Sequence, residues 1–193
     1  MTLTIKEMTN IFKLNSPAEI IEKLNRLNQR RNFPKTETFP FDELYKDTVT
    51  KIKTTELSAE CILYNSVEAH RDTTEFRKSD HWKELCKQEE IKSWWIFGQN
   101  GQGDWWLFDT NGKVYFYDHN QEEMCAENFV GLGIDFAKWI QFADLNKQCE
   151  ELYYSNEKEY FVDSLLKSAF AEDYKERLKE ISLELLQHYP FEI

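Results

Sequence analysis

The side chains of this sequence best suited to chemistry are its histidines, its cysteines and one adjacent acid–base pair, Asp118 and His119. No two histidines have the His-Glu-x-x-His spacing of zinc enzymes, and no two cysteines form a Cys-x-x-Cys pair. Scattered cysteines without a secretory leader are typical of free thiols in a reducing compartment. We therefore expect no metal ion, no cofactor and no disulfide. The residues concerned are His70, His81, His119, His188, Cys61, Cys86, Cys125 and Cys149.

Catalysis requires titratable groups that converge, and the sequence supports this only weakly. Asp118 and His119 lie next to each other at the end of a predicted strand, where successive side chains point to opposite faces. The glycines from Gly98 to Gly103 lack the Lys-Ser/Thr of a phosphate-binding loop, and a strand follows them. No nucleophile elbow is present. A Ser-His-Asp site built from distant residues stays open, because sequence order does not fix such sites. We predict no catalytic residues.

Three short aromatic runs form the most regular pattern in the chain: Trp94–Phe97, Trp105–Phe108 and Val114–Tyr117. Aromatic and β-branched residues are typical of strands. The segments 99–103 and 109–112 supply the glycine and asparagine that reversing turns need. The pattern predicts a three-stranded antiparallel meander.

Both faces of this meander are apolar, so both must be covered. Helices on each face would suffice. Alternatively, part of one face is an exposed patch that binds a partner, since large apolar patches often bind and tryptophan is favoured at binding hot spots. We name Trp105 as the candidate contact residue of such a patch.

The same segment resembles the central signature of the SUKH superfamily, which includes fungal cell-wall-synthesis regulators and bacterial immunity proteins that neutralise a cognate toxin. The chain departs from the signature at Gln102, where glycine is common, and at Tyr117, where tryptophan is common. A weaker likeness extends from Cys61 to Leu145. The resemblance implies a protein-binding domain without catalysis. The matching residues are Gly98, Asn100, Gly101, Gly103, Asp109, Val114, Tyr115, Asp118 and His119.

Near the N-terminus, Ser16, Pro17 and Glu19 form a capping box that predicts a helix start. We expect this helix to run to Phe33-Pro34. Its last turns would then hold Arg26, Arg30 and Arg31, where cations suit the helix dipole. The alternative explanation of these arginines is a nucleic-acid patch.

Further patterns predict a short helix over 42–53, a strand over 60–64, a strand-to-helix step at 66–68, a helix opening at Ser79-Asp80 and a helix over 135–143. On the helix that opens at Ser79-Asp80, Trp82 and Leu85 would share a face. The tail from Asn156 to Tyr189 is strongly helical in pattern, with possible capping boxes at Asn156 and Asp173. It is two helices or one long kinked helix.

These elements predict an α+β fold: an antiparallel sheet of about four to six strands with helices packed around it, plus an appended C-terminal helical segment. The 193 residues would form a single SUKH-like domain, with residues 156–189 packed on it as an extension. No apolar run is long enough to span a membrane, and the first residues lack the pattern of a secretory signal. We expect a cytoplasmic protein of undetermined oligomeric state.

The charge of the chain is unevenly placed. Residues 1–120 hold 19 acidic and 17 basic residues, whereas residues 121–193 hold 16 acidic and seven basic ones, −9 of the net −11. An acidic surface of this kind repels phosphate backbones and attracts a basic protein. The alternative is that the acidic residues only keep the protein soluble. Glu122, Glu123 and Glu127 are the acidic residues that we expect at a partner surface.

Together these observations predict a non-catalytic protein-binding module. The SUKH resemblance implies an immunity protein that occludes a cognate toxin, such as a nuclease or a deaminase. The alternatives are a regulatory scaffold for endogenous proteins and a small-molecule or carbohydrate binding module. A concave cleft with convergent polar groups would favour the last of these.

Overall fold

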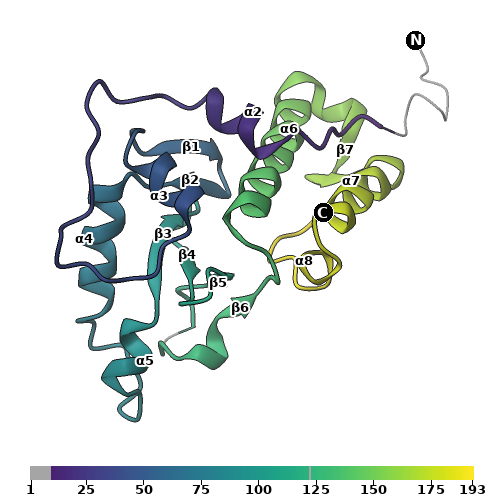
Figure 1. Ribbon diagram of the computed structural model, residues 1–193. Coiled ribbons are helices and arrows are strands. Elements are labelled where there is room, and N and C mark those ends of the chain that lie inside the picture. The colour runs from purple at the N-terminus through teal and green to yellow at the C-terminus, as the bar shows by residue number, and fades with distance from the viewer. Residues whose placement is uncertain (1–9, 122) are drawn as a thin grey trace.

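A computed structural model describes residues 10–121 and 123–193 of the chain. Its centre is a six-stranded antiparallel sheet in which spatial order follows chain order (Figure 1). The predicted α+β fold class is confirmed, and the strand count lies within the expected range. The strands are β1 (Thr55–Ser58), β2 (Cys61–Leu63), β3 (Trp95–Gln99), β4 (Trp105–Phe108), β5 (Val114–Tyr117) and β6 (Val130–Gly131).

The predicted meander is confirmed as β3, β4 and β5. Trp105 pairs with Tyr117 and Phe108 with Val114, so the bounds of β4 and β5 agree with the second and third aromatic runs. β3 begins one residue later than the first run and continues to Gln99, which was expected in the turn. In the second turn, the Asp109 carboxylate accepts hydrogen bonds from the backbone amides of Asn111 and Lys113. Gly112 adopts a φ of 72°, a left-handed conformation that glycine permits. Local turn chemistry thus determines where this hairpin reverses.

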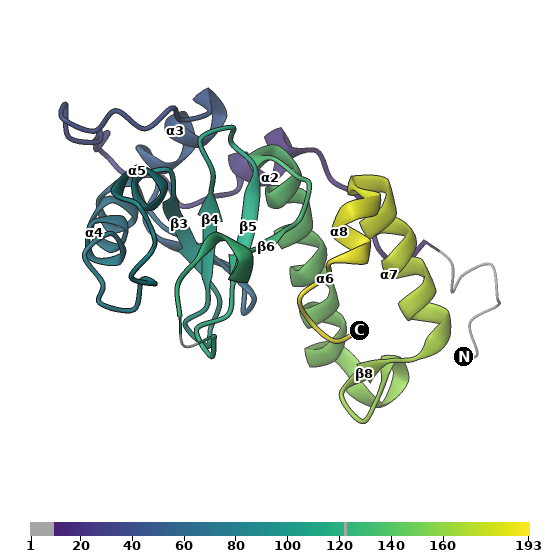
Figure 2. The same cartoon turned by 90° about the horizontal axis from the view of Figure 1, so that it is seen from below.

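Helices cover both faces of the sheet. The described helices are α2 (Pro17–Glu22), α3 (Glu43–Val49), α4 (Ser66–Phe76), α5 (Gln88–Lys92), α6 (Phe136–Tyr160), α7 (Ser168–Ile181) and α8 (Leu183–Gln187), with a short 3₁₀ helix over Ala126–Asn128. Figure 2 shows α4 on one side of the sheet, α6 on the other, and α7 and α8 beyond α6. None of the described helices is long and apolar enough to cross a membrane.

Aromatic side chains fill the space between these layers. Trp106 contacts Trp139 of α6 with ring centroids 5.8 Å apart, whereas its neighbour Trp105 contacts Phe76 of α4 at 5.4 Å. The period-two alternation of the strand therefore points the two rings to opposite faces. Of the six tryptophans, five are buried and Trp105 is only partly buried.

The first predicted helix is shorter than expected. Its capping box is present, because the Ser16 side chain accepts from the Glu19 backbone amide and the Glu19 carboxylate accepts from the Ser16 backbone amide. The prediction that it reaches Phe33 is wrong, since α2 ends at Glu22. Beyond it, Leu27 and Arg31 donate their backbone amides to carbonyls of the segment 50–51 instead of to an earlier helical turn.

The helix predicted to open at Ser79-Asp80 is also wrong. Trp82 forms an isolated parallel bridge with Met124, so this segment pairs with a distant one instead of coiling. Trp82 is buried, whereas Leu85 is 93% exposed, and the two do not share a buried face. The helix predicted over 42–53 likewise ends earlier, at Val49.

The C-terminal tail is not one helical segment. α6 begins after the Asp135 cap as predicted but continues to Tyr160, with a kink at Asn156. A two-stranded hairpin of β7 (Phe161–Val162) and β8 (Leu165–Leu166) then separates α6 from α7. The capping box suggested at Asp173 does not start a helix, because this residue is buried within α7. The buried side chains of α7 join the same hydrophobic cluster as the sheet and α6.

Candidate binding site

A hollow of about 650 Å³ opens at one end of the meander. It combines two aromatic rings with two imidazoles and a carboxylate. Partly apolar hollows of this size with a few polar groups are the usual form of ligand sites. The described lining residues are His81, Trp105, Tyr117, His119, Gln121, Glu123 and Met124.

The strands position the aromatic wall of this hollow. Trp105 begins β4, Tyr117 ends β5, and the two are register partners. Their rings stack with centroids 5.9 Å apart and an interplanar angle of 24°. The Tyr117 hydroxyl donates to the Gln121 carbonyl at 2.5 Å, which fixes the chain just beyond the strand. The sheet therefore presents both rings in a preformed arrangement.

The opposite wall comes from two segments that are far apart in the sequence. The Met124 amide donates to the His81 carbonyl at 2.8 Å, and the Lys83 amide donates to the Met124 carbonyl at 3.1 Å. Trp82 is anchored beneath them, since its indole N–H donates to the Phe76 carbonyl at 2.8 Å. Sequence reasoning missed His81, because only this long-range pairing brings it to the hollow.

His119 is held by Asp104 and not by its neighbour Asp118. The Nδ1 of His119 lies 2.6 Å from Asp104 Oδ1, and the His119 backbone amide donates to the same oxygen at 3.0 Å. Asp104 is buried, and its other oxygen accepts from the Asn100 side-chain amide at 2.8 Å. Asp118 instead accepts two hydrogen bonds from Asn120. The acid–base pair that the sequence suggested is therefore replaced by a pair fifteen residues apart.

These contacts account for part of the signature that resembles the SUKH family. Asn100 also accepts from the backbone amides of Gln102 and Asp104, which closes the turn between β3 and β4. The turn is thereby tied to the end of β5 through His119. Among the described lining residues there is no serine, threonine or cysteine that the imidazole could activate as a nucleophile. The hydrogen bonds with Asp104 hold the His119 ring in place at the hollow.

Asp104, Asp118 and His119 also bring three possible metal ligands within 4.8 Å of one another. Zinc ligands about 2.0 Å from the ion in tetrahedral geometry lie roughly 3.3 Å apart. The 2.6 Å between His119 Nδ1 and Asp104 Oδ1 is instead a hydrogen-bond distance. The cluster as it stands is a hydrogen-bonded pair beside a turn carboxylate.

Of the predicted partner-contacting acids, Glu123 lines the hollow and Glu127 is exposed on the 3₁₀ helix, while Glu122 lies outside the described residues. Lys83 lies 3.7 Å from Glu123. The pKa of Glu127 is lowered, first by a hydrogen bond from Cys125 and then by its own backbone and Lys83. One lysine thus offsets part of this acidic group.

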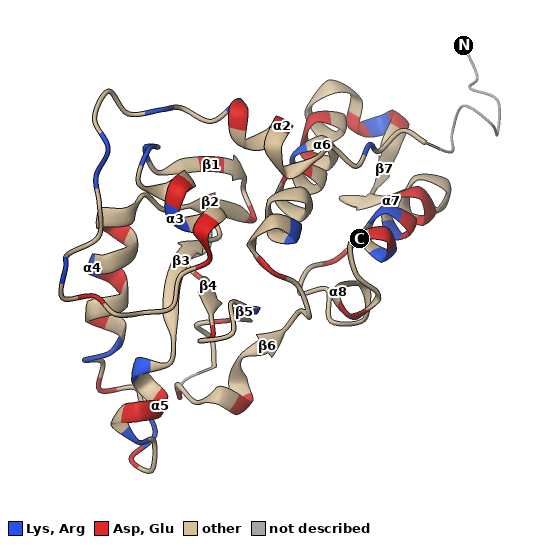
Figure 3. Ribbon diagram, in the orientation of Figure 1, with Lys and Arg blue, Asp and Glu red and all other residues tan. Residues whose placement is uncertain are grey.

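Basic residues also lie among the acidic residues in the last third of the chain. On α7, three glutamates and Asp173 pair with Lys175, Arg177 and Lys179 at spacings of three or four residues. The mixed colours of that helix show this interleaving (Figure 3). Such a helix is typical of a solvated face. The acidic residues of α7 are therefore largely offset by basic residues of the same helix.

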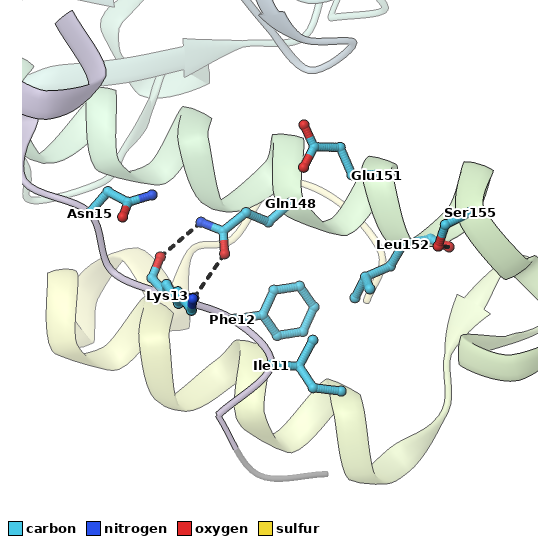
Figure 4. Close-up of a pocket in the computed structure, with 8 residues that line it drawn as sticks. All are labelled: Ile11, Phe12, Lys13, Asn15, Gln148, Glu151, Leu152 and Ser155. Atoms are coloured by element: carbon cyan, nitrogen blue, oxygen red, sulfur yellow. Dashed lines mark hydrogen bonds between the residues drawn. The ribbon is translucent and has the colours of Figure 1, made fainter. Parts of the chain in front are cut away.

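A second hollow, of about 470 Å³, lies between the N-terminal segment and α6. Figure 4 shows Gln148 facing Lys13, with its amide clamping the Lys13 backbone by two 2.8 Å hydrogen bonds. The Phe12 amide donates to the buried Asp173 carboxylate at 3.1 Å, and the Phe12 ring packs edge-on against Tyr174. These contacts fasten the N-terminal segment between α6 and α7, which makes this hollow part of the scaffold.

The four cysteines are free thiols, and Cys61 and Cys125 are buried. Burial raises the pKa of Cys149 to about 12, with a smaller contribution from Glu150, and raises the pKa of Cys61 well above its usual range. Burial and Glu90 raise the pKa of Cys86 less. Because the thiolate is the reactive form, we expect Cys86 to react first.

A thiol reagent at pH 8 should therefore label the native protein mainly at Cys86, and the Cys86→Ser variant should lose this fast phase. The denatured, unreduced protein should show all four thiols. Fewer than four would contradict the free-thiol assignment. A fast native phase of three thiols would contradict the burial of Cys61 and Cys125.

No protein-family model matches this chain, and neither a curated protein nor a solved structure is matched by it. The resemblance to the SUKH superfamily therefore stays a prediction that rests on the signature residues of the meander.

Proposed function

We propose that this protein is a non-catalytic binding module of the SUKH type, an immunity protein that docks a basic protein toxin over the hollow lined by Trp105. Docking there would occlude the active site of the toxin by steric and electrostatic means. The observation that carries the proposal is the position of Trp105, the one tryptophan of six that is not buried, at a preformed hollow.

The aromatic wall supports this proposal on energetic grounds. Tryptophan and tyrosine are common hot-spot residues because they bury a large area at little loss of conformational freedom. Trp105 is backed by Phe76 and stacked on Tyr117, so its ring is already held in place before a partner arrives. Leu85, 93% exposed, belongs to the same segment as His81 and adds apolar surface. A preordered surface loses less entropy on binding.

Charge supports the choice of a basic partner. Glu123 is exposed at the hollow, Glu127 follows it, and the chain as a whole carries −11. A nuclease presents a basic surface to its nucleic acid, so this surface would be attracted to the acidic one. Association should slow as salt rises, because the Debye length falls from roughly 30 Å at 0.01 M to about 8 Å at 0.15 M.

The test uses the protein encoded by the neighbouring gene as the partner. Its toxicity should be suppressed by co-expression of this chain, and the purified pair should bind. Replacing Trp105 by alanine should weaken binding about 30-fold, which corresponds to about 2 kcal/mol. The matched control is Tyr154→Ala, because Tyr154 is an 81% exposed aromatic residue on α6 away from the hollow.

Equal losses for Trp105→Ala and Tyr154→Ala would show that the hollow is not the docking surface. An association rate indifferent to salt would remove the electrostatic part. Turnover of a substrate by the purified protein, lost in His119→Ala, would replace binding by catalysis that uses the Asp104–His119 pair.

One observation favours a second function, the binding of a small molecule or carbohydrate. The hollow is concave, and His81, His119, Gln121 and Glu123 supply polar groups beside an aromatic wall. A sugar would pack its apolar face on the Trp105 ring, and its hydroxyl groups would donate hydrogen bonds to the Glu123 carboxylate. Saturable quenching of tryptophan fluorescence by a free oligosaccharide, abolished in Trp105→Ala, would support this function in place of toxin binding.

A further inference from the structure

The arginines near the N-terminus have no helix to explain them. Their sequence positions suggested the C-terminal end of a helix, where cations suit the dipole. Because α2 ends at Glu22, Arg26, Arg30 and Arg31 lie instead in the connection between α2 and α3. Figure 3 shows basic positions along this connection. Compensation of a helix dipole therefore does not explain why these three arginines lie close together in the sequence.

These residues line a hollow of about 490 Å³, which we call the basic loop site. The lining residues are Arg26, Leu27, Asn28, Gln29, Arg30, Arg31 and Lys53. The site shares no lining residue with the hollow that contains Trp105. The inference from it is therefore independent of the proposed toxin binding.

The backbone of the basic loop site is fixed at both ends. The Leu27 amide donates to the Lys51 carbonyl at 2.6 Å, and the Arg31 amide donates to the Thr50 carbonyl at 2.8 Å. In the other direction, the Lys53 amide donates to the Asn25 carbonyl at 3.2 Å. Between these anchors, the amides of residues 28–30 have no acceptor among the described residues. The anchors thus fix the backbone of the loop on both sides of these three unpaired amides.

The positive charge of the site is only partly balanced. Arg30 donates its Nε to the Thr50 hydroxyl at 3.0 Å and has one amino nitrogen 3.8 Å from Asp47, a carboxylate that also pairs with Lys51. Arg26, Arg31 and Lys53 are exposed and form no ion pair within 4.0 Å among the described residues. In a chain of net charge −11, three such cations around one hollow form a distinct local excess.

We propose that the basic loop site binds a compact oligophosphate, held by Arg26, Arg31 and Lys53 and by the free loop amides. Guanidinium groups match phosphate oxygens in pairs of parallel hydrogen bonds, and consecutive backbone amides form anion-binding concavities. The Asn28 and Gln29 side chains offer further amide donors. Oligophosphates concentrate several charges within the dimensions of one hollow.

The same residues disfavour a nucleic acid as the ligand. Proteins that hold single strands combine a basic groove with aromatic rings on which bases stack. None of the described residues that line this site is aromatic. A long polyanion would also extend over the acidic remainder of the chain and be repelled there. A compact ligand places its charge in the hollow and avoids this repulsion.

The test is titration calorimetry of the full-length protein with tripolyphosphate and, separately, with ATP. One equivalent of tripolyphosphate should bind, and Arg26→Ala/Arg31→Ala should weaken it by at least about tenfold. Both substitutions keep the backbone donors that pin the loop. The control is Lys113→Ala/Lys138→Ala, which removes two exposed cations elsewhere and should leave affinity within about twofold.

If ATP binds more tightly than tripolyphosphate, the natural ligand is a nucleotide. If the two affinities are equal, the site recognises the phosphate groups alone, as in an inorganic oligophosphate. Absence of tripolyphosphate binding, or equal weakening by both double variants, would overturn the proposal. Tighter binding of a 20-nucleotide single strand or of anionic phospholipid vesicles would also overturn it. If the arginine variant melts at a lower temperature than the parent, the Lys53→Glu variant replaces it. Its affinity for tripolyphosphate should also fall by at least about tenfold.

Discussion

Replacing Gly98 by alanine is expected to lower the free energy of unfolding by about 3 kcal/mol. Gly98 lies in β3 opposite Leu63 of β2. A methyl group at this position would overlap the backbone carbonyl oxygen of Ile62, and behind it lies the Trp106 ring at 3.6 Å. Backbone within a paired strand cannot turn aside as a flexible side chain can. β2 and β3 would have to separate, and chemical denaturation would measure the loss.

The matched control for this variant is Gly101→Ala in the adjoining turn. The added methyl group would lie 3.3 Å from the Ala59 carbonyl oxygen, a contact that a small shift relieves. Its unfolding free energy should stay within about 1 kcal/mol of the parent. Equal stabilities of the two variants would contradict the close approach of β2 to Gly98.

Replacing Leu178 by alanine is expected to lower the unfolding free energy by about 3 kcal/mol. Leu178 is fully buried on α7 and belongs to the hydrophobic cluster that includes the sheet and α6. Truncation would leave a cavity in this cluster, and the surrounding side chains relax only partly around such cavities. Thermal and urea unfolding of the purified protein would both report the change.

Leu183→Ala is the control, because Leu183 lies on the neighbouring α8 and is 56% exposed. It should change stability by no more than about 0.5 kcal/mol. If Leu178→Ala proved as mild as Leu183→Ala, α7 would be a loosely attached appendage. Loss of stability confined to a separate, early unfolding transition would mean the same.

Elements with strong local patterns could be predicted from the sequence alone. The alternating aromatics and the turn residues at Asp109–Gly112 determined the meander, and Ser16 with Glu19 determined where α2 begins. These patterns work because turns, caps and strand alternation use contacts between residues that are close in sequence. The sequence also singled out Trp105 as a candidate contact residue, although alternation alone does not show which face of a sheet is covered.

Only the tertiary structure decided where several of these elements end and what their polar groups bind. Arg31 donates its amide to Thr50, and so α2 does not continue, while Trp82 pairs with Met124 in place of a helix. Asp173 looked like a helix cap but binds the Phe12 amide 161 residues away.

The residues of the candidate sites were likewise only partly predictable, because tertiary contacts bring several of them together. Trp105 and His119 could be named from the sequence, but His81 and Asp104 could not be assigned to the hollow. The arginines were placed on a helix that ends before it reaches them. A backbone amide or a carboxylate binds whichever partner the fold brings within about 3 Å. That choice depends on the packing of segments far apart in the chain, and neither composition nor spacing records it.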